Sequence, residues 1–142
     1  MTMNTEALLE VVSYTEHKAE IQHIRREVFI TEQGIPESLE WDDFETSSWH
    51  VLAYTNGKPV ATGRLQPDGK ITRIAVLKSA RKQGLATRIL QSLLSLAEQH
   101  AIKSLYLNAQ TSAVGLYEKH GFARHGEVFD EGGIDHVRMQ RL

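Results

Sequence analysis

The chain has 142 residues, of which 41% are hydrophobic and 24% charged, as expected for one globular domain spanning residues 1–142. Its 16 basic and 18 acidic residues give a net charge of −2, which argues against a nucleic-acid partner. The lack of cysteine excludes disulfides, thiolate metal sites and cysteine nucleophiles. Residues 1–10 show no leader-like pattern and no run approaches the ~20 apolar residues of a membrane helix, so we expect a cytoplasmic protein with no membrane partner.

The first half of the chain predicts several strands and one helix. The expected elements are a strand over 9–14, a helix over 16–30 capped by Thr15, strands over 49–54 and 60–65, and a strand over 70–76. Asn56 and Gly57 predict a tight hairpin, because both residues of that turn need positive φ. A turn at 67–69 then makes the last of these strands antiparallel to its neighbour.

The second half changes to a helical period. A broad apolar face predicts a helix over 84–99, followed by a strand over 104–108, a helix over 112–119 and a closing hairpin over 123–129 and 134–140. The strand, helix and strand across 70–108 form a βαβ unit, whose two strands should be parallel. Together these elements predict an α/β (α+β) domain with a mixed, mostly antiparallel sheet and flanking helices.

The segment from Arg81 to Thr87 offers the chemistry of an anion site. It lies between a strand and a long helix, and a helix start carries unpaired N–H groups and a partial positive charge that attract phosphate. Gly84 allows close backbone approach, and Arg81 and Lys82 add positive charge. The alternative is an ordinary loop that contains one glycine and two basic residues. The pattern is neither a Walker loop nor a dinucleotide-binding fingerprint.

Three stretches of the chain resemble one family. The run Arg-Lys-Gln-Gly-Leu-Ala at 81–86 follows Ile-Thr-Arg-Ile-Ala-Val at 71–76 and is similar to the acyl-CoA loop of the GNAT superfamily of N-acetyltransferases. The strand at 105–108 and the run Leu-Tyr-Glu-Lys-His-Gly-Phe at 116–122 resemble its later signature. The run Arg-Arg-Glu-Val-Phe-Ile-Thr-Glu-Gln at 25–33 looks like the ElaA-like and YjcF-like branch. The resemblance covers roughly residues 8–142.

The resemblance implies a seven-stranded sheet that splays open between the strands at 70–76 and 104–108, with acetyl-CoA as cosubstrate in the opening. It implies that the backbone of the first of these strands binds the pantetheine arm and that the loop binds the pyrophosphate. Asn108 would add an amide on the same side, and Tyr117 would contact the cofactor and protonate the departing thiolate. The implied cofactor-binding residues are Ile74, Ala75, Val76, Arg81, Lys82, Gln83, Gly84, Leu85, Ala86, Thr87, Asn108 and Tyr117.

The general base is the open assignment. The family often places a carboxylate on the strand before the CoA loop, but Thr72 and Arg73 stand there instead. Glu32 leads as a candidate because it lies in the branch's own stretch, and the alternatives are His50, Glu131 and His136. No histidine pair shows metal-ligand spacing, so we expect no metal.

The acidic segment at 37–46 is interpreted as a solvated surface that could also attract a cationic amine. Arg25 and Arg26 could pair with these acids or bind an acidic group of the substrate.

The leading functional hypothesis is direct acetyl transfer from acetyl-CoA to a primary amine in a ternary complex. The amine could belong to a small molecule, a peptide or a protein. The alternative is a non-catalytic acyl-CoA-binding module on the same fold. The oligomeric state is left open, with a homodimer formed through sheet edges as one alternative.

Overall fold

The computed structural model describes residues 6–142. Residues 1–5, the first half of the segment with no leader-like pattern, lie outside the described part. The strands are Leu8–Val12 (β1), Trp49–Thr55 (β2), Lys58–Leu65 (β3), Ile71–Val76 (β4), Leu105–Gln110 (β5), Ala123–Arg124 (β6), Phe129–Glu131 (β7) and Ile134–Arg141 (β8). The α-helices are Tyr14–Arg25 (α1), Glu37–Glu40 (α2), Leu85–Gln99 (α3) and Val114–Glu118 (α4). A π-helical segment covers Arg26–Glu32 (η1), and 3-10 turns cover Lys78–Ala80 (η2) and Thr111–Ala113 (η3).

The strands form two antiparallel sheets that meet at one point. The first has the order β1-β2-β3-β4, and the second has the order β5-β8-β6 with β7 also paired to β8. Among the described residues, the two sheets share a single parallel bridge between Lys70 and Tyr106. The predicted α/β class, the splay between the two central strands and the βαβ unit are therefore confirmed.

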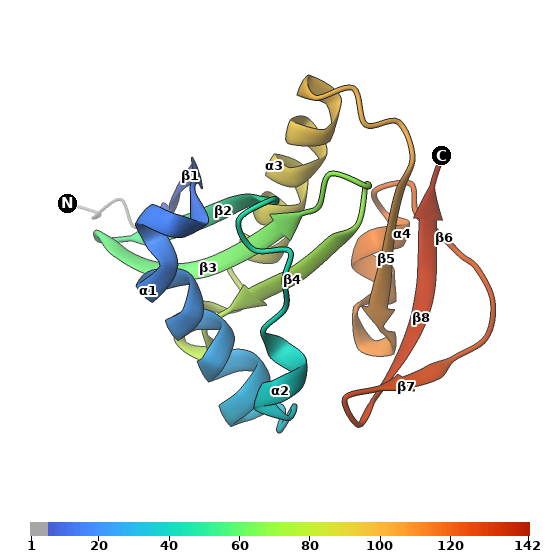
Figure 1. The fold of residues 1–142 in the computed structure, drawn as a ribbon, viewed down its shortest axis with the longest axis horizontal. Helices are drawn as coiled ribbons and strands as arrows, with labels where there is room; N and C mark the ends of the chain where they lie inside the picture. The colour runs from blue at the N-terminus through green and yellow to red at the C-terminus, as the bar shows by residue number, and fades with distance from the viewer. Residues whose placement is uncertain (1–5) are drawn as a thin grey trace.

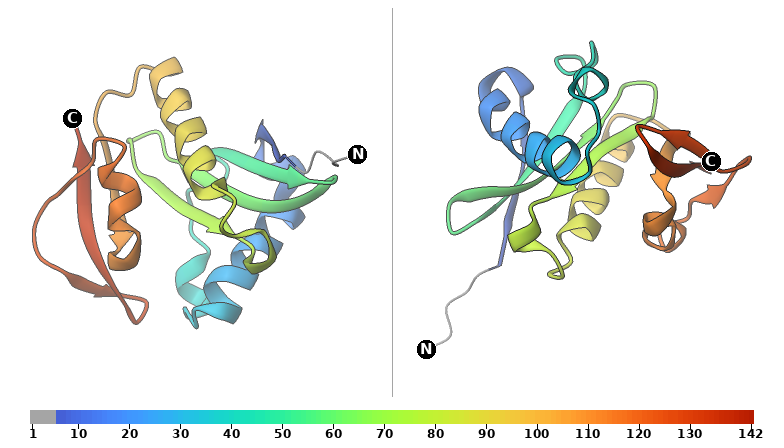
Figure 2. Two further views of the ribbon diagram at one scale, coloured as in Figure 1. Left: turned by 180° about the vertical axis from the view of Figure 1, so that it is seen from behind. Right: turned by 90° about the horizontal axis from the view of Figure 1, so that it is seen from below.

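Helices cover both faces of the strands (Figure 1). Helices α1 and α2 lie on one face, and α3 and α4 lie on the other, as the views from behind and below show (Figure 2). None of the helices in residues 6–142 is long and apolar enough to cross a membrane.

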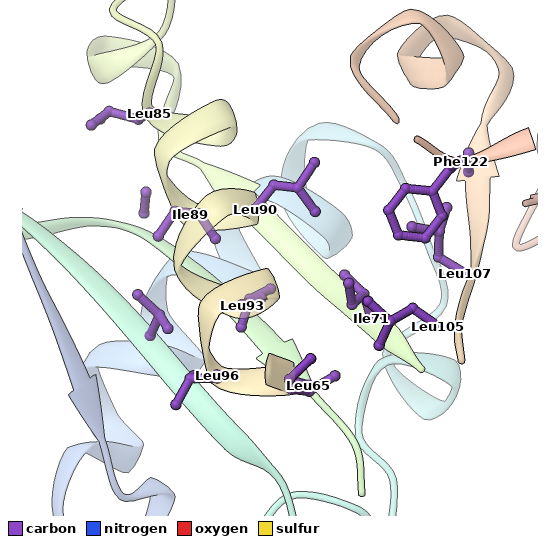
Figure 3. Packing of buried hydrophobic residues seen from close by; sticks show 14 of the residues in the cluster. Leu65, Ile71, Leu85, Ile89, Leu90, Leu93, Leu96, Leu105, Leu107 and Phe122 are labelled. Atoms are coloured by element: carbon purple, nitrogen blue, oxygen red, sulfur yellow. The ribbon is translucent and has the colours of Figure 1, made fainter. Parts of the chain in front are cut away.

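The main core lies under α3. Its apolar face packs on β3 and β4 and reaches toward β5, so that one cluster joins both sheets (Figure 3). Ile89 and Leu93 are fully buried, and a Cβ at Gly63 of β3 would overlap the Ile89 side chain. The glycine therefore lets the helix pack directly against the strand. A smaller cluster, with Ile21 and Ile24, sits under α1 on the opposite face.

Strand β4 contains a bulge. Thr62 of β3 pairs with Ala75 and Arg64 pairs with Thr72, so Arg73 and Ile74 together face Gly63. Arg73 has φ of 60°, a left-handed conformation that costs a non-glycine residue roughly 1–2 kcal/mol. A bulge bends its strand and increases its twist. It falls just beyond the bridge at Lys70, where β4 and β5 begin to separate.

Two local predictions were wrong. The cap of α1 is Ser13, whose hydroxyl accepts a hydrogen bond from the backbone N–H of Glu16 at 3.1 Å, and the α-helix ends at Arg25 before the π-helical η1. Thr15 lies inside the helix because the earlier serine already satisfies a free N–H of its first turn. The strand expected over 123–129 is divided into β6 and β7.

The acidic segment at 37–46, which includes α2, is a solvated surface only in part: Glu37 and Asp43 are exposed, but two other acids are not. Glu40 and Glu45 are 3% and 7% exposed. Arg25, which is fully buried, donates to Glu40 Oε2 at 2.7 Å and to Glu45 Oε1 at 2.8 Å. Arg64 donates to Glu45 Oε1 at 2.7 Å and to both oxygens of Asp42 at 2.8 Å.

Arg73 completes this group. It donates to the Glu40 carbonyl at 2.9 Å and to Asp42 Oδ2 at 3.3 Å. Burial alone would raise the pKa of Asp42, but hydrogen bonds from Arg64 and the Phe44 amide, with the nearby guanidinium charges, outweigh it and hold the pKa at about 2. We call Arg25, Arg64, Arg73, Glu40, Asp42 and Glu45 the buried ion network. It ties α1 and the segment after α2 to β3 and β4.

The neighbouring residues Arg25 and Arg26 test the importance of this network. Arg25→Met should lower the free energy of unfolding by about 3–5 kcal/mol, because the buried Glu40 and Glu45 carboxylates each lose one of the two arginines that pair with them. Arg26 pairs with Glu37 at the surface, so Arg26→Met should change that free energy little. Urea denaturation of both variants gives the comparison, and equal effects would contradict a stabilising role for the network.

Candidate active site

The space between the diverging strands is a cavity of about 390 Å³. Its lining comes from η1 and α2 on one side, from β4, β5 and α4 in the middle, and from the β7–β8 hairpin on the other side. The lining residues fall in three stretches of the chain, 28–40, 70–86 and 107–136, which come together where the two sheets separate (Figure 1).

The edge of β4 that faces β5 is open. Ile74, Ala75 and Val76 all line the cavity, as the resemblance implied. Within the described residues, this edge has no ladder to β5 beyond the bridge at Lys70. Peptide groups on such an edge need partners, and an extended ligand can supply them in the way an added strand would.

The loop at 81–87 ends at the start of α3. Gly84 is the residue before the helix and has φ of 76°, and Lys82 has φ of 64°. No side chain in the described part of the chain caps the first turn of α3, so its first N–H groups have no helical or capping partner. A Cβ at Gly84 would meet nothing within 4 Å, so the left-handed φ explains the glycine. Arg81 and Ala86 reach the cavity lining.

Tyr117 and Asn108 stand on the wall opposite β4. Both line the cavity, and the Tyr117 ring packs edge-on against Phe122 with 6.1 Å between ring centroids. Burial raises the pKa of the Tyr117 hydroxyl to about 12, so the phenol keeps its proton at neutral pH. The Asn108 amide donates to Glu131 Oε2 at 3.3 Å.

Glu32, the leading candidate for the base, does not line the cavity. Both of its oxygens accept hydrogen bonds from the Arg81 guanidinium, and Arg81 also donates to the Val76 carbonyl at 3.0 Å. The hydrogen bonds from Arg81 hold the pKa of the Glu32 carboxyl below its usual range. The structure thus brings Glu32 to the loop at 81–87, where it is a partner of Arg81.

The other three candidates separate clearly. His50 lies on β2, is 1% exposed and contacts the Glu45 carbonyl through Nε2 at 2.8 Å, away from the cavity lining. Glu131 and His136 both line the cavity.

The tautomer of His136 follows from its hydrogen bond. Its Nδ1 lies 2.7 Å from the Ile134 carbonyl, which only accepts, so Nδ1 carries a proton, and in the neutral ring the lone pair is on Nε2. The ring also stacks on Phe129 at 6.0 Å. In residues 6–142 no group of three or more His, Asp or Glu side chains could hold a metal ion.

Two features of the site were not foreseen. Gln110 Nε2 donates to Gln33 Oε1 at 2.9 Å, which joins β5 to the end of η1 across the cavity. Gln33 lies inside the stretch that resembles the family. Its hydrogen bond joins two residues distant in sequence, however, so no local pattern indicates the bond. The sequence gives no signal for the bulge at Arg73 either, because arginine has no preference for positive φ.

Comparisons with known proteins agree with this geometry. The acetyltransferase (GNAT) domain family matches residues 10–142. The uncharacterised N-acetyltransferase YjcF of Bacillus subtilis is 39% identical over 123 residues, which cover 84% of this chain and 88% of YjcF. The protein ElaA of Escherichia coli is 30% identical over 126 residues, or 83% of this chain and 82% of ElaA.

Solved structures share the fold. An acyl-CoA N-acyltransferase from Pseudomonas aeruginosa superimposes with a TM-score of 0.87 and 27% identity, covering 96% of this chain and 100% of that one. A GNAT family acetyltransferase from Elizabethkingia anophelis, solved with acetyl-CoA bound, gives a TM-score of 0.70 at 20% identity, covering 98% and 99% of the two chains. The chain belongs to the GNAT acetyltransferase family, in agreement with the predicted resemblance.

Proposed function

We propose that this protein transfers an acetyl group from acetyl-CoA directly to a primary amine within a ternary complex. The observation that carries this proposal is the open edge of β4, which runs through the cavity to the uncapped start of α3 and faces Tyr117. The edge suits an extended amide-containing arm, and the helix start suits a diphosphate.

The chain's own groups fit the donor. The backbone of Ile74, Ala75 and Val76 would bind the pantetheine arm, and the N–H groups from Gln83 to Thr87, with the side chains of Arg81 and Lys82, would bind the pyrophosphate. Asn108 would orient the arm from the β5 side. The diphosphate would compete with the Glu32 carboxylate for Arg81, so the ion pair between them opens when the donor binds.

Acetyl-CoA supplies an activated acyl group as a thioester. The amine nitrogen forms a bond to the thioester carbon, and the carbon–sulfur bond breaks. A backbone N–H of β4 would stabilise the negative charge that develops on the carbonyl oxygen. One proton leaves the amine nitrogen and one reaches the sulfur, so that the products are an N-acetyl amine and free CoA.

Tyr117 is the proposed general acid for the sulfur. Its phenol is protonated at neutral pH and lies in the cavity wall opposite β4. Burial raises the pKa of the departing CoA thiol as it raises that of the phenol. The proton transfer from Tyr117 to the sulfur is therefore less unfavourable than the phenol pKa alone would suggest.

His136 replaces Glu32 as the proposed general base. The Nε2 lone pair of His136 is free of the contact that Nδ1 makes, and the ring lines the cavity. Glu32 has a lowered pKa and both of its oxygens engaged by Arg81, which makes it a weaker base. Glu131, held by Asn108, can orient the incoming ammonium group.

The proposal predicts that the purified protein releases free thiol from acetyl-CoA only when an amine is added. A screen of amines that follows thiol release and the mass of the acetylated product measures this. Tight CoA binding without turnover on any amine would favour the alternative, a non-catalytic acyl-CoA-binding module.

Replacement of Tyr117 by phenylalanine removes the proposed proton donor and keeps the ring. We expect Tyr117→Phe to lower kcat by about 10²- to 10⁴-fold, while the Kd for acetyl-CoA stays near that of the wild type. Steady-state kinetics and calorimetric titration separate the two quantities. Unchanged turnover would reject the acid role.

A matched pair of variants decides between the two candidate bases. His136→Gln should lower kcat by about 10²-fold or more, because glutamine cannot accept the proton at neutral pH. Glu32→Gln should retain turnover and bind CoA more tightly, because Arg81 is released from its carboxylate partner. Both variants are measured at saturating amine. The reverse pattern would restore Glu32 as the base.

A further inference from the structure

The residues proposed to bind acetyl-CoA line only part of the cavity, and we call the remaining part the acceptor half. One of its walls comes from η1, from residues 33–35 and from α2, and the other comes from the β7–β8 hairpin. Helices α3 and α4, whose ends carry the donor-side groups, cover the opposite face of the strands (Figure 2). An acceptor would therefore enter from the face covered by α1 and α2.

The N-terminal wall of this half is largely apolar. Val28 and Phe29 are 4% and 8% exposed, and Ile35 continues the wall. Leu39, which also lines the cavity, is 56% exposed, so the wall ends in a large apolar side chain open to solvent. An apolar ligand that covered Leu39 would remove this side chain from water.

Two contacts bridge this half of the cavity. The Gln33 and Gln110 amides are hydrogen-bonded at 2.9 Å, and they come from the two opposite sides of the opening. The tip of the β7–β8 hairpin is packed on Ile35, since a Cβ at Gly132 would lie 3.3 Å from Ile35 Cγ1. An extended polypeptide laid across this half of the cavity would meet both contacts.

The space that remains is small. A cavity of about 390 Å³ is near the lower end of the roughly 300–1,000 Å³ found for small-molecule sites, and the pantetheine arm must share it. Polar groups line both ends of the acceptor half, with Gln33 and Glu40 on the N-terminal wall and the Glu131 carboxylate and His136 toward β5 and the hairpin. Glu40 is already paired with Arg25, so Glu131 is the carboxylate left to meet an ammonium group. An ammonium group would be recognised beside Glu131, and an apolar body would lie against Phe29, Ile35 and Leu39.

We infer that the acceptor is a compact primary amine with an apolar body, such as a short arylalkylamine, and is neither a polypeptide lysine, a polyamine nor an aminosugar. This inference rests on the proposed acetyl transfer and specifies its substrate. Phe29, Ile35 and Leu39 would contact the apolar body, and the bridge between Gln33 and Gln110 would exclude larger acceptors.

The test compares kcat/KM for phenethylamine, spermidine, glucosamine and a lysine-containing hexapeptide at saturating acetyl-CoA. We expect phenethylamine to exceed each of the others by at least about tenfold, since an apolar pocket discriminates by such factors. Gln110→Ala removes one side of the amide bridge and should raise the ratio of hexapeptide to phenethylamine kcat/KM by roughly tenfold. Gln99→Ala is the matched control, because Gln99 is the last residue of α3 and, within residues 6–142, its side-chain amide donates to Ser95 Oγ at 3.3 Å, outside the cavity lining.

The outcomes separate this inference from the proposed function. Thiol release with any of the four amines supports acetyl transfer. Equal or better use of the hexapeptide, spermidine or glucosamine by the wild type would overturn the compact apolar acceptor while acetyl transfer stands. No thiol release with any amine, together with CoA binding, would count against both. An unchanged selectivity ratio in Gln110→Ala would reject the amide bridge as the excluding element.

Discussion

The left-handed backbone at Arg73 is the constraint on which the site depends. It creates the bulge in β4, and the bulge bends that strand where its pairing with β5 stops. A non-glycine residue holds such a conformation only when its surroundings compensate for the cost. Here the guanidinium is held by the Glu40 carbonyl and by Asp42, and the same acids are held by Arg25 and Arg64. The buried ion network therefore stabilises both the bulge and the opening beside it.

The opening separates two kinds of chemistry. On the side of α3 and α4, free peptide groups, an uncapped helix start and a protonated phenol suit a thioester donor with a diphosphate. On the side of α1 and α2, an apolar wall and the hairpin that carries Glu131 and His136 suit an amine. The contact between Glu32 and Arg81 connects these two regions. Glu32 belongs to η1, which carries part of the apolar wall, and Arg81 belongs to the loop at 81–87. Binding of a donor that displaces Glu32 from Arg81 would therefore release a contact that holds η1, and η1 forms part of the wall of the acceptor half.

The proposed donor side rests largely on local signals in the sequence. A helix start after a strand, a glycine at 84 and a tyrosine in the run at 116–122 are readable without tertiary information. The sequence offers no such local signal with which to choose among the candidate bases. Glu32 and His136 both stand in plausible positions along the chain, and only the folded structure brings His136 into the cavity wall and gives Glu32 an arginine partner. The prediction of a solvated surface at 37–46 failed in part for a related reason. The charge of the segment does not reveal that its partners, Arg25 and Arg64, are buried beneath it.

The sequence by itself determined the class of fold, the order of the elements, the hairpin at Asn56 and Gly57, and the family to which the chain belongs. These features follow from hydrophobic period, turn chemistry and short motifs, all of which act over a few neighbouring residues. The tertiary structure alone decided the bulge at Arg73, the burial of the charged segment and the bridge between Gln33 and Gln110. Each of these depends on side chains distant in the sequence, whose meeting is set by how the two sheets and their covering helices pack.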